Sequence, residues 1–186
     1  MNADLVRQVA AHHPGDAREF RSLSRIRALL AWLPRPFDEH ADATHVTASG
    51  IVLDGHGHLL LHRHKRLGRW LQPGGHLDPG ELPWEAARRE TAEETGLVAT
   101  HPSSGPLLVH VDVHEGPRGH VHLDLRYLLR ADGDAPPAPA IGESPEVAWC
   151  SSEQVADRGD ASTVAALVAA RRHPRARGCF GEEGGW

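Results

Sequence analysis

The sequence is poor in several residue types, and each scarcity narrows what the protein can do. It has two cysteines, Cys150 in a strand-like stretch and Cys179 in a glycine-rich tail, and their different contexts argue against a structural disulfide. Lys65 is the only lysine among 20 basic residues, which we interpret as genome bias and not as function. No apolar run reaches the roughly 18 residues of a membrane helix, and no signal peptide is recognisable, so we expect a cytoplasmic protein.

The net charge and the length of the chain limit the classes of partner and the number of domains that we expect. The net charge of −5 at pH 7 argues against a general nucleic-acid binder and against a membrane-surface protein. A chain of 186 residues with 40% hydrophobic content suits one domain with a sizeable core. We therefore expect neither nucleic acid nor membrane as a partner.

The stretch from Gly74 to Leu97 reads as a tight glycine loop followed by a helix. Pro83 suits the first turn of a helix, where its missing N–H would have no partner, and Gly96 suits the left-handed position that ends one. We therefore predict a helix from about Leu82 to Thr95. Its core-facing stripe consists of Trp84, Ala87 and Thr91.

An anionic edge lies beside this stripe. Glu90, Glu93 and Glu94 fall within about 100° of arc around the helix. Carboxylates at such a short distance repel one another unless they share a cation. Oxygen ligation by glutamates, a backbone carbonyl and waters suits a hard divalent ion such as Mg²⁺. Because Gly74 and Gly75 have no Cβ, the backbone can come close to that ion or to a phosphate.

The spacing of charged and glycine residues in this stretch is specific. Seven specified residues at roughly 7% usage each coincide by chance at a given position on the order of once in 10⁸. They are Gly75, Glu81, Arg89, Glu90, Glu93, Glu94 and Gly96.

This pattern, from Gly75 to Leu97, resembles the Nudix box of the Nudix hydrolase family. The preceding run from Trp70 resembles the segment that leads into the box, and a looser resemblance extends from about Thr44 to Ala156. Thr91 departs from the pattern, since the family usually has an aliphatic residue there, and we expect only a small packing adjustment.

The resemblance implies an α/β fold, namely an α/β/α sandwich with a mixed sheet. It also implies an enzyme that cleaves a phosphoanhydride bond in a nucleoside diphosphate linked to another moiety. The implied cofactor is Mg²⁺, with Mn²⁺ as a substitute, and the implied partner is a small-molecule nucleotide. Two alternatives use the same fold. A catalytically silent nucleotide sensor usually has a degraded box, whereas every acid is present here. An isopentenyl diphosphate isomerase needs a cysteine in the strands before the box, where neither Cys150 nor Cys179 lies.

Roles for the acids follow from the charge inventory. The predicted metal ligands are Glu90, Glu93, Glu94 and a carbonyl of Gly74 or Gly75. Such an ion would neutralise phosphoryl oxygens and lower the pKa of a water molecule. Glu93 is the first choice for the base that accepts the proton of this water, and Glu143, in the loop before Trp149, is the second.

Two further box residues are expected to hold the site in place. Arg89 is counted with the catalytic residues, because its guanidinium can pair with Glu85 and Glu93 along the helix and fix the carboxylate rotamers. Glu81 is expected to buttress the loop against the helix, or to orient water, and not to transfer protons.

A helical extension is expected over residues 1–43. Asp16 can cap a helix whose apolar residues recur at three- and four-residue steps. These residues are Phe20, Leu23, Ile26, Leu30 and Leu33. We expect this stripe to pack on the hydrolase domain of residues 44–173, with a homodimer contact as the alternative. A flexible tail is expected over residues 174–186.

Two strands, Thr44 to Asp54 and His58 to His64, are expected to form a hairpin, because Asp54-Gly55 is a strong turn signal. A basic loop then leads to the box. Arg66 and Arg69 in this loop are candidate contacts for a polyphosphate, and the alternative is an ordinary surface loop.

Alternating residues predict a second pair of strands, Pro106 to His114 and His120 to Arg130. Val109, Val111 and Val113 are expected to share one face. The opposite faces of the two strands would form a polar patch of His110, Asp112, His114, His120, His122 and Asp124. Three readings are open: a solvated sheet face, a zinc site, or part of the substrate cleft, with His110 and His122 as substrate contacts.

Overall fold

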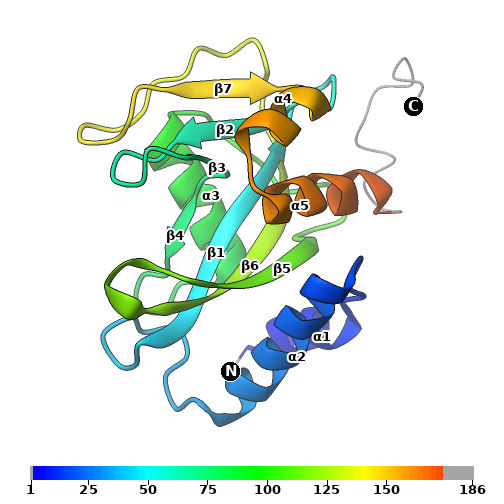
Figure 1. Cartoon of the computed structure of the whole chain (residues 1–186), viewed down its shortest axis with the longest axis vertical. Coiled ribbons are helices and arrows are strands. Elements are labelled where there is room, and N and C mark those ends of the chain that lie inside the picture. Colours follow the sequence, from blue (N-terminus) through cyan, green and yellow to red (C-terminus); the bar gives the residue numbers. More distant parts are fainter. Residues whose placement is uncertain (1, 174–186) are drawn as a thin grey trace.

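The computed structural model describes residues 2–173, which form a seven-stranded mixed sheet with helices on both faces and along one edge (Figure 1). The helices are α1 (Ala3–Ala11), α2 (Ala17–Trp32), α3 (Pro83–Thr95), α4 (Ser152–Arg158) and α5 (Ala161–Arg172). The strands are β1 (Thr44–Leu53), β2 (Leu59–Arg63), β3 (Trp70–Leu71), β4 (Gly74–His76), β5 (Leu108–Glu115), β6 (Val121–Arg130) and β7 (Val147–Cys150). The predicted α/β architecture is confirmed, and the predicted tail lies outside the described residues. Within residues 2–173, every helix is too short or too polar to serve as a transmembrane segment.

The sheet is built on β1. This strand pairs in parallel with β6 over its whole length, and antiparallel with β2 and β4 on its other side. The path through the sheet is β3-β2-β1-β6-β5. The predicted hairpin is confirmed: the Asp54 carboxylate accepts hydrogen bonds from the backbone N–H groups of His56 (2.8 Å) and His58 (2.7 Å) and so closes the turn between β1 and β2.

Alternate residues of β1 face opposite sides of the sheet. Val46, Ala48 and Val52 belong to the core cluster that includes residues of α3. Ile51 and Leu53 belong to the cluster that includes residues of α4 and α5. Figure 1 shows α5 crossing one face of the sheet while α3 lies behind the other. The sheet therefore separates the acidic helix from the C-terminal helices.

The open edge of β5 is covered by α2. Asp16 caps this helix as predicted, by accepting a hydrogen bond from the N–H of Glu19 (2.8 Å). The Glu19 carboxylate accepts a hydrogen bond from the N–H of Val111 (3.1 Å), and the Ser22 hydroxyl oxygen accepts one from the N–H of Val113 (3.1 Å). Because an unpaired strand edge invites pairing with another strand, these side chains protect the edge.

The buried stripe of α2 differs from the predicted stripe at its start. Leu23, Ile26 and Leu30 are buried as predicted. Phe20 is 61% exposed, so its predicted place in the stripe is wrong. The neighbouring Glu19 takes the inward position because its carboxylate binds the backbone of β5.

A β-bulge interrupts the alternation of β5. The register against β6 shifts between Leu108 and His110. Val111 belongs to the core cluster on the α3 side, with Val113 packed against it, whereas Val109 belongs to the cluster on the α5 side. The prediction that the three valines share a face is therefore wrong, because a bulge adds one residue and reverses the faces beyond it.

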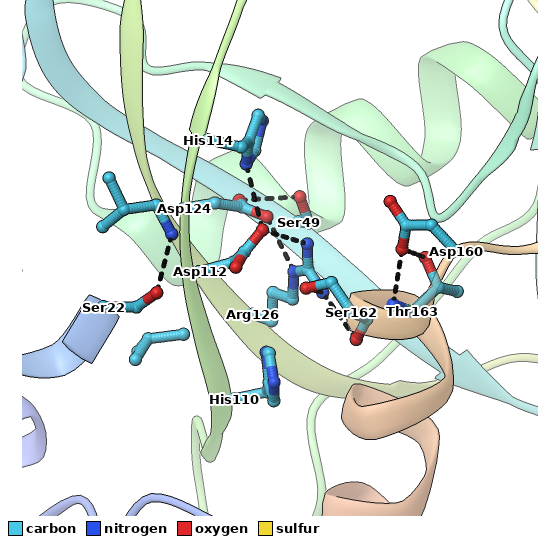
Figure 2. A network of polar contacts seen from close by, with 12 residues as sticks. Ser22, Ser49, His110, Asp112, His114, Asp124, Arg126, Asp160, Ser162 and Thr163 are labelled. Atoms are coloured by element: carbon cyan, nitrogen blue, oxygen red, sulfur yellow. Dashed lines mark hydrogen bonds and ion pairs between the residues drawn. The ribbon is translucent and has the colours of Figure 1, made fainter. Parts of the chain in front are cut away.

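The polar face of β5 and β6 is buried at its centre and not solvated. Figure 2 shows the network of polar contacts that its side chains form. Arg126, 3% exposed, donates to Asp124 (2.8 Å), lies 3.5 Å from Asp112, and donates to the hydroxyl (2.9 Å) and carbonyl (3.1 Å) oxygens of Ser162 on α5. Burial alone would raise the pKa of both aspartates. The hydrogen bond from His114 to Asp112 and the charge of Arg126 outweigh it, and both pKa values are lowered.

We expect Arg126→Met to destabilise the fold by about 3–5 kcal/mol, because it leaves two buried carboxylates without their main counter-charge. Arg18→Met is the matched control: this guanidinium lies 3.2 Å from Asp112 but is 47% exposed, so a loss of about 1 kcal/mol or less is expected. Urea denaturation at pH 7 measures both variants. Equal losses would contradict the assignment of Arg126 as the main counter-charge.

Candidate active site

The acidic helix α3 begins and ends as predicted. Pro83 is its first residue, and the Glu85 side chain accepts a hydrogen bond from the N–H of the preceding Leu82 (3.0 Å). Gly96 ends the helix in the left-handed conformation, with φ of 73°. A Cβ at this position would also collide with the backbone of Ala138. Backbone conformation and close packing therefore both require glycine there.

Arg89 is the cation that organises the site. Its guanidinium forms a two-point ion pair with Glu81, with both distances 2.9 Å. It also donates to Glu90 (2.8 Å) and Glu93 (3.1 Å). A further N–H donates to the backbone carbonyl of His76 (2.8 Å). One side chain thus connects β4, the following loop and the helix.

Glu81 takes the place predicted for Glu85 beside Arg89. The Glu85 carboxylate binds the helix start at Leu82, and Arg89 turns toward the loop. Glu81 also accepts a hydrogen bond from the N–H of Asp78 (2.9 Å), so it ties the loop to the helix. Burial raises the pKa of Glu81, but the hydrogen bond from Arg89 outweighs it and the net shift is downward.

Glu90 and Glu94 lie directly against the Gly74–Gly75 backbone. The N–H of Gly74 donates to the Glu94 carboxylate (2.9 Å). A Cβ on Gly75 would come within 2.5 Å of a carboxylate oxygen of Glu90, so glycine leaves the room that this side chain occupies. The close backbone approach expected from the two glycines is present, and two of the predicted metal ligands share it.

Glu93 and Glu143 are the accessible acids of the site. The Glu93 side chain is 51% exposed. Glu143 is exposed in the loop before β7, and its charge acts on Glu94. This loop and the segment after β2 line a cavity of about 280 Å³. Both residues considered as bases are therefore open to water.

Burial makes the Glu94 carboxyl a weaker acid than that of an ordinary glutamate. Burial first, and then the charges of Glu90 and Glu143, raise the pKa of Glu94 to about 8. Burial also raises the pKa of Glu90. His62 Nε2 lies 3.3 Å from the Glu94 carboxyl, and burial lowers the pKa of His62 to about 4. At neutral pH a neutral His62 imidazole therefore faces a protonated Glu94 carboxyl. No local sequence pattern predicts that these two residues meet.

The remaining predicted contacts lie elsewhere. Arg66 is exposed in the loop after β2, and Arg69 of the same loop lies 3.6 Å from Asp160, the residue before α5. His110 is 3% exposed beside Glu19, away from the acids of α3. His122 belongs to a separate group of histidines. Their roles in substrate binding stay predictions.

The fold and the site together define a class of protein. A mixed sheet between helices carries an acidic helix whose carboxylates meet a double-glycine backbone, an arrangement that offers a cluster of oxygen ligands for a hard cation. The NUDIX domain family matches residues 43–170, and the chain belongs to this family. Nudix hydrolases act on phosphoanhydride bonds, and the protein is an enzyme of this kind.

Three relatives illustrate the similarity. An isopentenyl-diphosphate Delta-isomerase of Streptomyces griseus is 32% identical over 159 residues, 76% of each chain. An asymmetrical bis(5′-nucleosyl)-tetraphosphatase of Caenorhabditis elegans is 46% identical over 46 residues, 25% of this chain and 30% of that protein. The structure of a NUDIX-family hydrolase from Clostridium perfringens superposes with a TM-score of 0.57 at 30% identity, over 67% of this chain and 95% of that chain. The tetraphosphatase match thus spans less than a third of that protein's length.

In the metal-free protein, we expect Glu94→Gln to raise the free energy of unfolding at pH 7.5 by about 1–3 kcal/mol. The pKa of an unfolded glutamate is about 4.3, and that of folded Glu94 is about 8. Between these values the unfolded state gives up a proton that the folded state keeps, so stability falls as pH rises through this window. Glutamine removes the penalty and keeps an oxygen for the N–H of Gly74.

Glu93→Gln is the matched control, because its side chain is half exposed and a change within about 0.5 kcal/mol is expected. Urea denaturation with EDTA at pH 5 and pH 7.5 measures both variants. The stabilisation by Glu94→Gln should shrink at pH 5. The same effect at both pH values, or destabilisation at pH 7.5, would show that Glu94 does not carry the buried proton.

Proposed function

We propose that this enzyme is a divalent-metal-dependent pyrophosphohydrolase that cleaves a nucleoside diphosphate linked to a second moiety. The observation that carries the proposal is the convergence of Glu90 and Glu94 on the Gly74–Gly75 backbone, beside Arg89. A pyrophosphate is itself anionic, so it is compatible with this site only when cations lie between them.

The residues fit a hard divalent cation. The proposed ligands are Glu90, Glu93, Glu94 and a carbonyl of Gly74 or Gly75. They offer only oxygen, which suits Mg²⁺ and also Mn²⁺. Burial and the repulsion of neighbouring carboxylates raise the pKa values of Glu90 and Glu94, and a bound cation would offset both effects. When bound, such an ion supplies charge neutralisation at the phosphoryl oxygens and lowers the pKa of water.

The protein's own side chains position the acids and take up the proton. Arg89 holds Glu81, Glu90 and Glu93 in one arrangement. We propose Glu93 as the base that accepts the proton of the attacking water, because its side chain is more exposed than those of Glu81, Glu90 and Glu94. Glu143 is the second choice, for the case in which Glu93 is used as a metal ligand, because a base must reach the water without being used as a ligand.

We propose a small nucleotide as the substrate. Arg66 and Arg69 lie on the loop whose residues line the cavity beside Glu143, where they would meet a polyphosphate. The C. elegans relative is named for a bis(5′-nucleosyl) tetraphosphate, but that match covers 46 residues. Dinucleoside polyphosphates therefore belong in a substrate panel and are not singled out.

An isopentenyl diphosphate isomerase is the second candidate, because the S. griseus isomerase matches 76% of each chain. That reaction would call for a cysteine in the strands before the box. The strands β1 to β4 contain none, and Cys150 lies buried on β7. Hydrolysis is the stronger proposal for this reason.

A substrate panel tests the proposal. Full-length protein with millimolar Mg²⁺ is incubated with nucleoside triphosphates, ADP-ribose, nucleotide sugars, dinucleoside polyphosphates and isopentenyl diphosphate, and the products are separated by chromatography. Cleavage at a phosphoanhydride bond is expected for one class of nucleotide. Turnover of isopentenyl diphosphate alone would establish the isomerase, and nucleotide binding without any product would establish a silent sensor.

Glu93→Gln and Glu94→Gln are each expected to lower kcat on the preferred substrate by about 10²-fold or more, because each removes a charge that binds the cation or accepts a proton. Glu153→Gln is the control, since it changes an exposed acid on α4. Circular dichroism confirms that all three variants are folded. If both box variants kept the wild-type rate, the acids of α3 would not perform the reaction.

Metal binding should also displace the proton of Glu94. Because the pKa of this carboxyl is about 8, we expect Mg²⁺ binding at pH 7 to release about one proton per chain, and the affinity to rise toward pH 8. Isothermal titration calorimetry in two buffers of different ionisation enthalpy measures the release. Unchanged release in Glu94→Gln would place the proton on a different acid.

A further inference from the structure

A group of histidines at one end of the polar sheet face lies apart from the acids of α3. His45 on β1, His76 on β4 and His122 on β6 each place a ring nitrogen so that all three lie within 4.8 Å of one another. The distances between ring centroids are 5.0 to 5.2 Å. Ligands that come from three strands of one sheet are held more rigidly than ligands on loops.

Strand register brings these rings together. His45 lies opposite His122 in the parallel pairing of β1 with β6. The antiparallel pairing of β1 with β4 places His76 opposite Thr47, two residues along β1 from His45. Residues two apart on a strand share a face, so all three rings project to the same side of the sheet.

Two of the rings have one nitrogen held and the other without a partner. His45 Nδ1 lies 3.0 Å from the carbonyl oxygen of Asp42, and His76 Nδ1 lies 3.5 Å from a carboxylate oxygen of Glu39. Nε2 of each ring is buried and has no hydrogen-bond partner. Metal-ligating histidines commonly donate their other N–H to a carbonyl or a carboxylate, which leaves the lone pair on the ligating nitrogen. Buried polar atoms without partners call for an explanation, and a bound cation supplies one.

The third ring sits in a position that glycine makes available. A Cβ on Gly116 would collide with the His122 ring, so the connection from β5 to β6 closes over this ring only because residue 116 is glycine. His114 is also near His122, with 5.3 Å between centroids. Its Nδ1, however, lies 3.3 Å from Asp112, which directs that ring to the Arg126 network shown in Figure 2.

We propose that His45, His76 and His122 bind one zinc ion, with a fourth position open to water or to a substrate oxygen. Imidazole nitrogen suits Zn²⁺, and three protein ligands with an open position are typical of reactive zinc sites. The His76 side chain is 35% exposed, so the group of histidines lies near the surface. The all-oxygen set on α3 suits Mg²⁺, so the two sites select different ions. This proposal does not depend on the proposed hydrolase function.

Equilibrium zinc binding tests the proposal. Chelator-treated full-length protein competes for Zn²⁺ with a chromophoric chelator, and one ion per chain is expected. His76→Gln and His122→Gln should each weaken binding by about 100-fold or more, and Glu39→Gln by about tenfold. Glu94→Gln should bind zinc as the wild type does. The double variant His13→Gln/His56→Gln, which removes two exposed imidazoles, controls for adventitious binding.

Two spectroscopic readouts report the ligands without measuring activity. Co²⁺ in place of Zn²⁺ should give the visible absorption of a tetrahedral site, and His122→Gln should abolish it. X-ray absorption of the zinc protein should count three imidazoles. Circular dichroism confirms folding, and the partly exposed His76 is varied in preference to the fully buried His45. Wild-type zinc affinity in both His76→Gln and His122→Gln, or loss of binding in Glu94→Gln, would overturn the proposal and leave the hydrolase function standing.

Discussion

The pairing of β1 with β6 is the interaction on which the rest of the structure depends. The two strands run parallel in matched register from end to end, so paired residues of the two strands project to the same face of the sheet. The row of Ala48 and Leu125 is apolar and lies in the core cluster shared with α3. The next row, Ser49 and Arg126, is polar and faces α5. A slip of one residue would exchange these faces. This register therefore keeps the acids of α3 on one side and the histidines on the other.

Buried carboxylates have different partners on the two sides of the sheet. On the α5 side, Arg126 binds the aspartates and α5, and the lowered pKa values of Asp112 and Asp124 show carboxylates stabilised in their charged form. On the α3 side, Arg89 binds three glutamates but leaves Glu94 without a cation, and its pKa is raised. The first network favours the fold, whereas the second lowers stability in a way that a bound cation would reverse. A functional site commonly carries such a cost.

The parts that the sequence could predict are those encoded by neighbouring residues. Pro83 and Gly96 mark the ends of α3, and helical periodicity alone places its acids on one edge. Long-range pairings carry no such signal. His62 meets Glu94 because β2 lies near α3, and His76 meets His45 because β4 pairs with β1. The sequence hypothesis of a zinc site therefore drew its ligands from β5 and β6, whereas two of the three clustered rings come from other strands. Burial of the polar face likewise depends on the docking of α2 and α5.

The short strand β4 connects the two sides. The N–H of Gly74 binds Glu94, and the His76 carbonyl binds Arg89, while the His76 ring faces His45. Both candidate metal sites thus use one three-residue strand, yet their ligand chemistry differs. The oxygen set prefers a hard cation and the imidazole set prefers zinc, so the ions would not compete for one site. β4 is therefore the element through which the two candidate sites contact each other. Coupling between two binding sites is reciprocal, so any effect that an ion at one site has through β4 has an equal counterpart at the other.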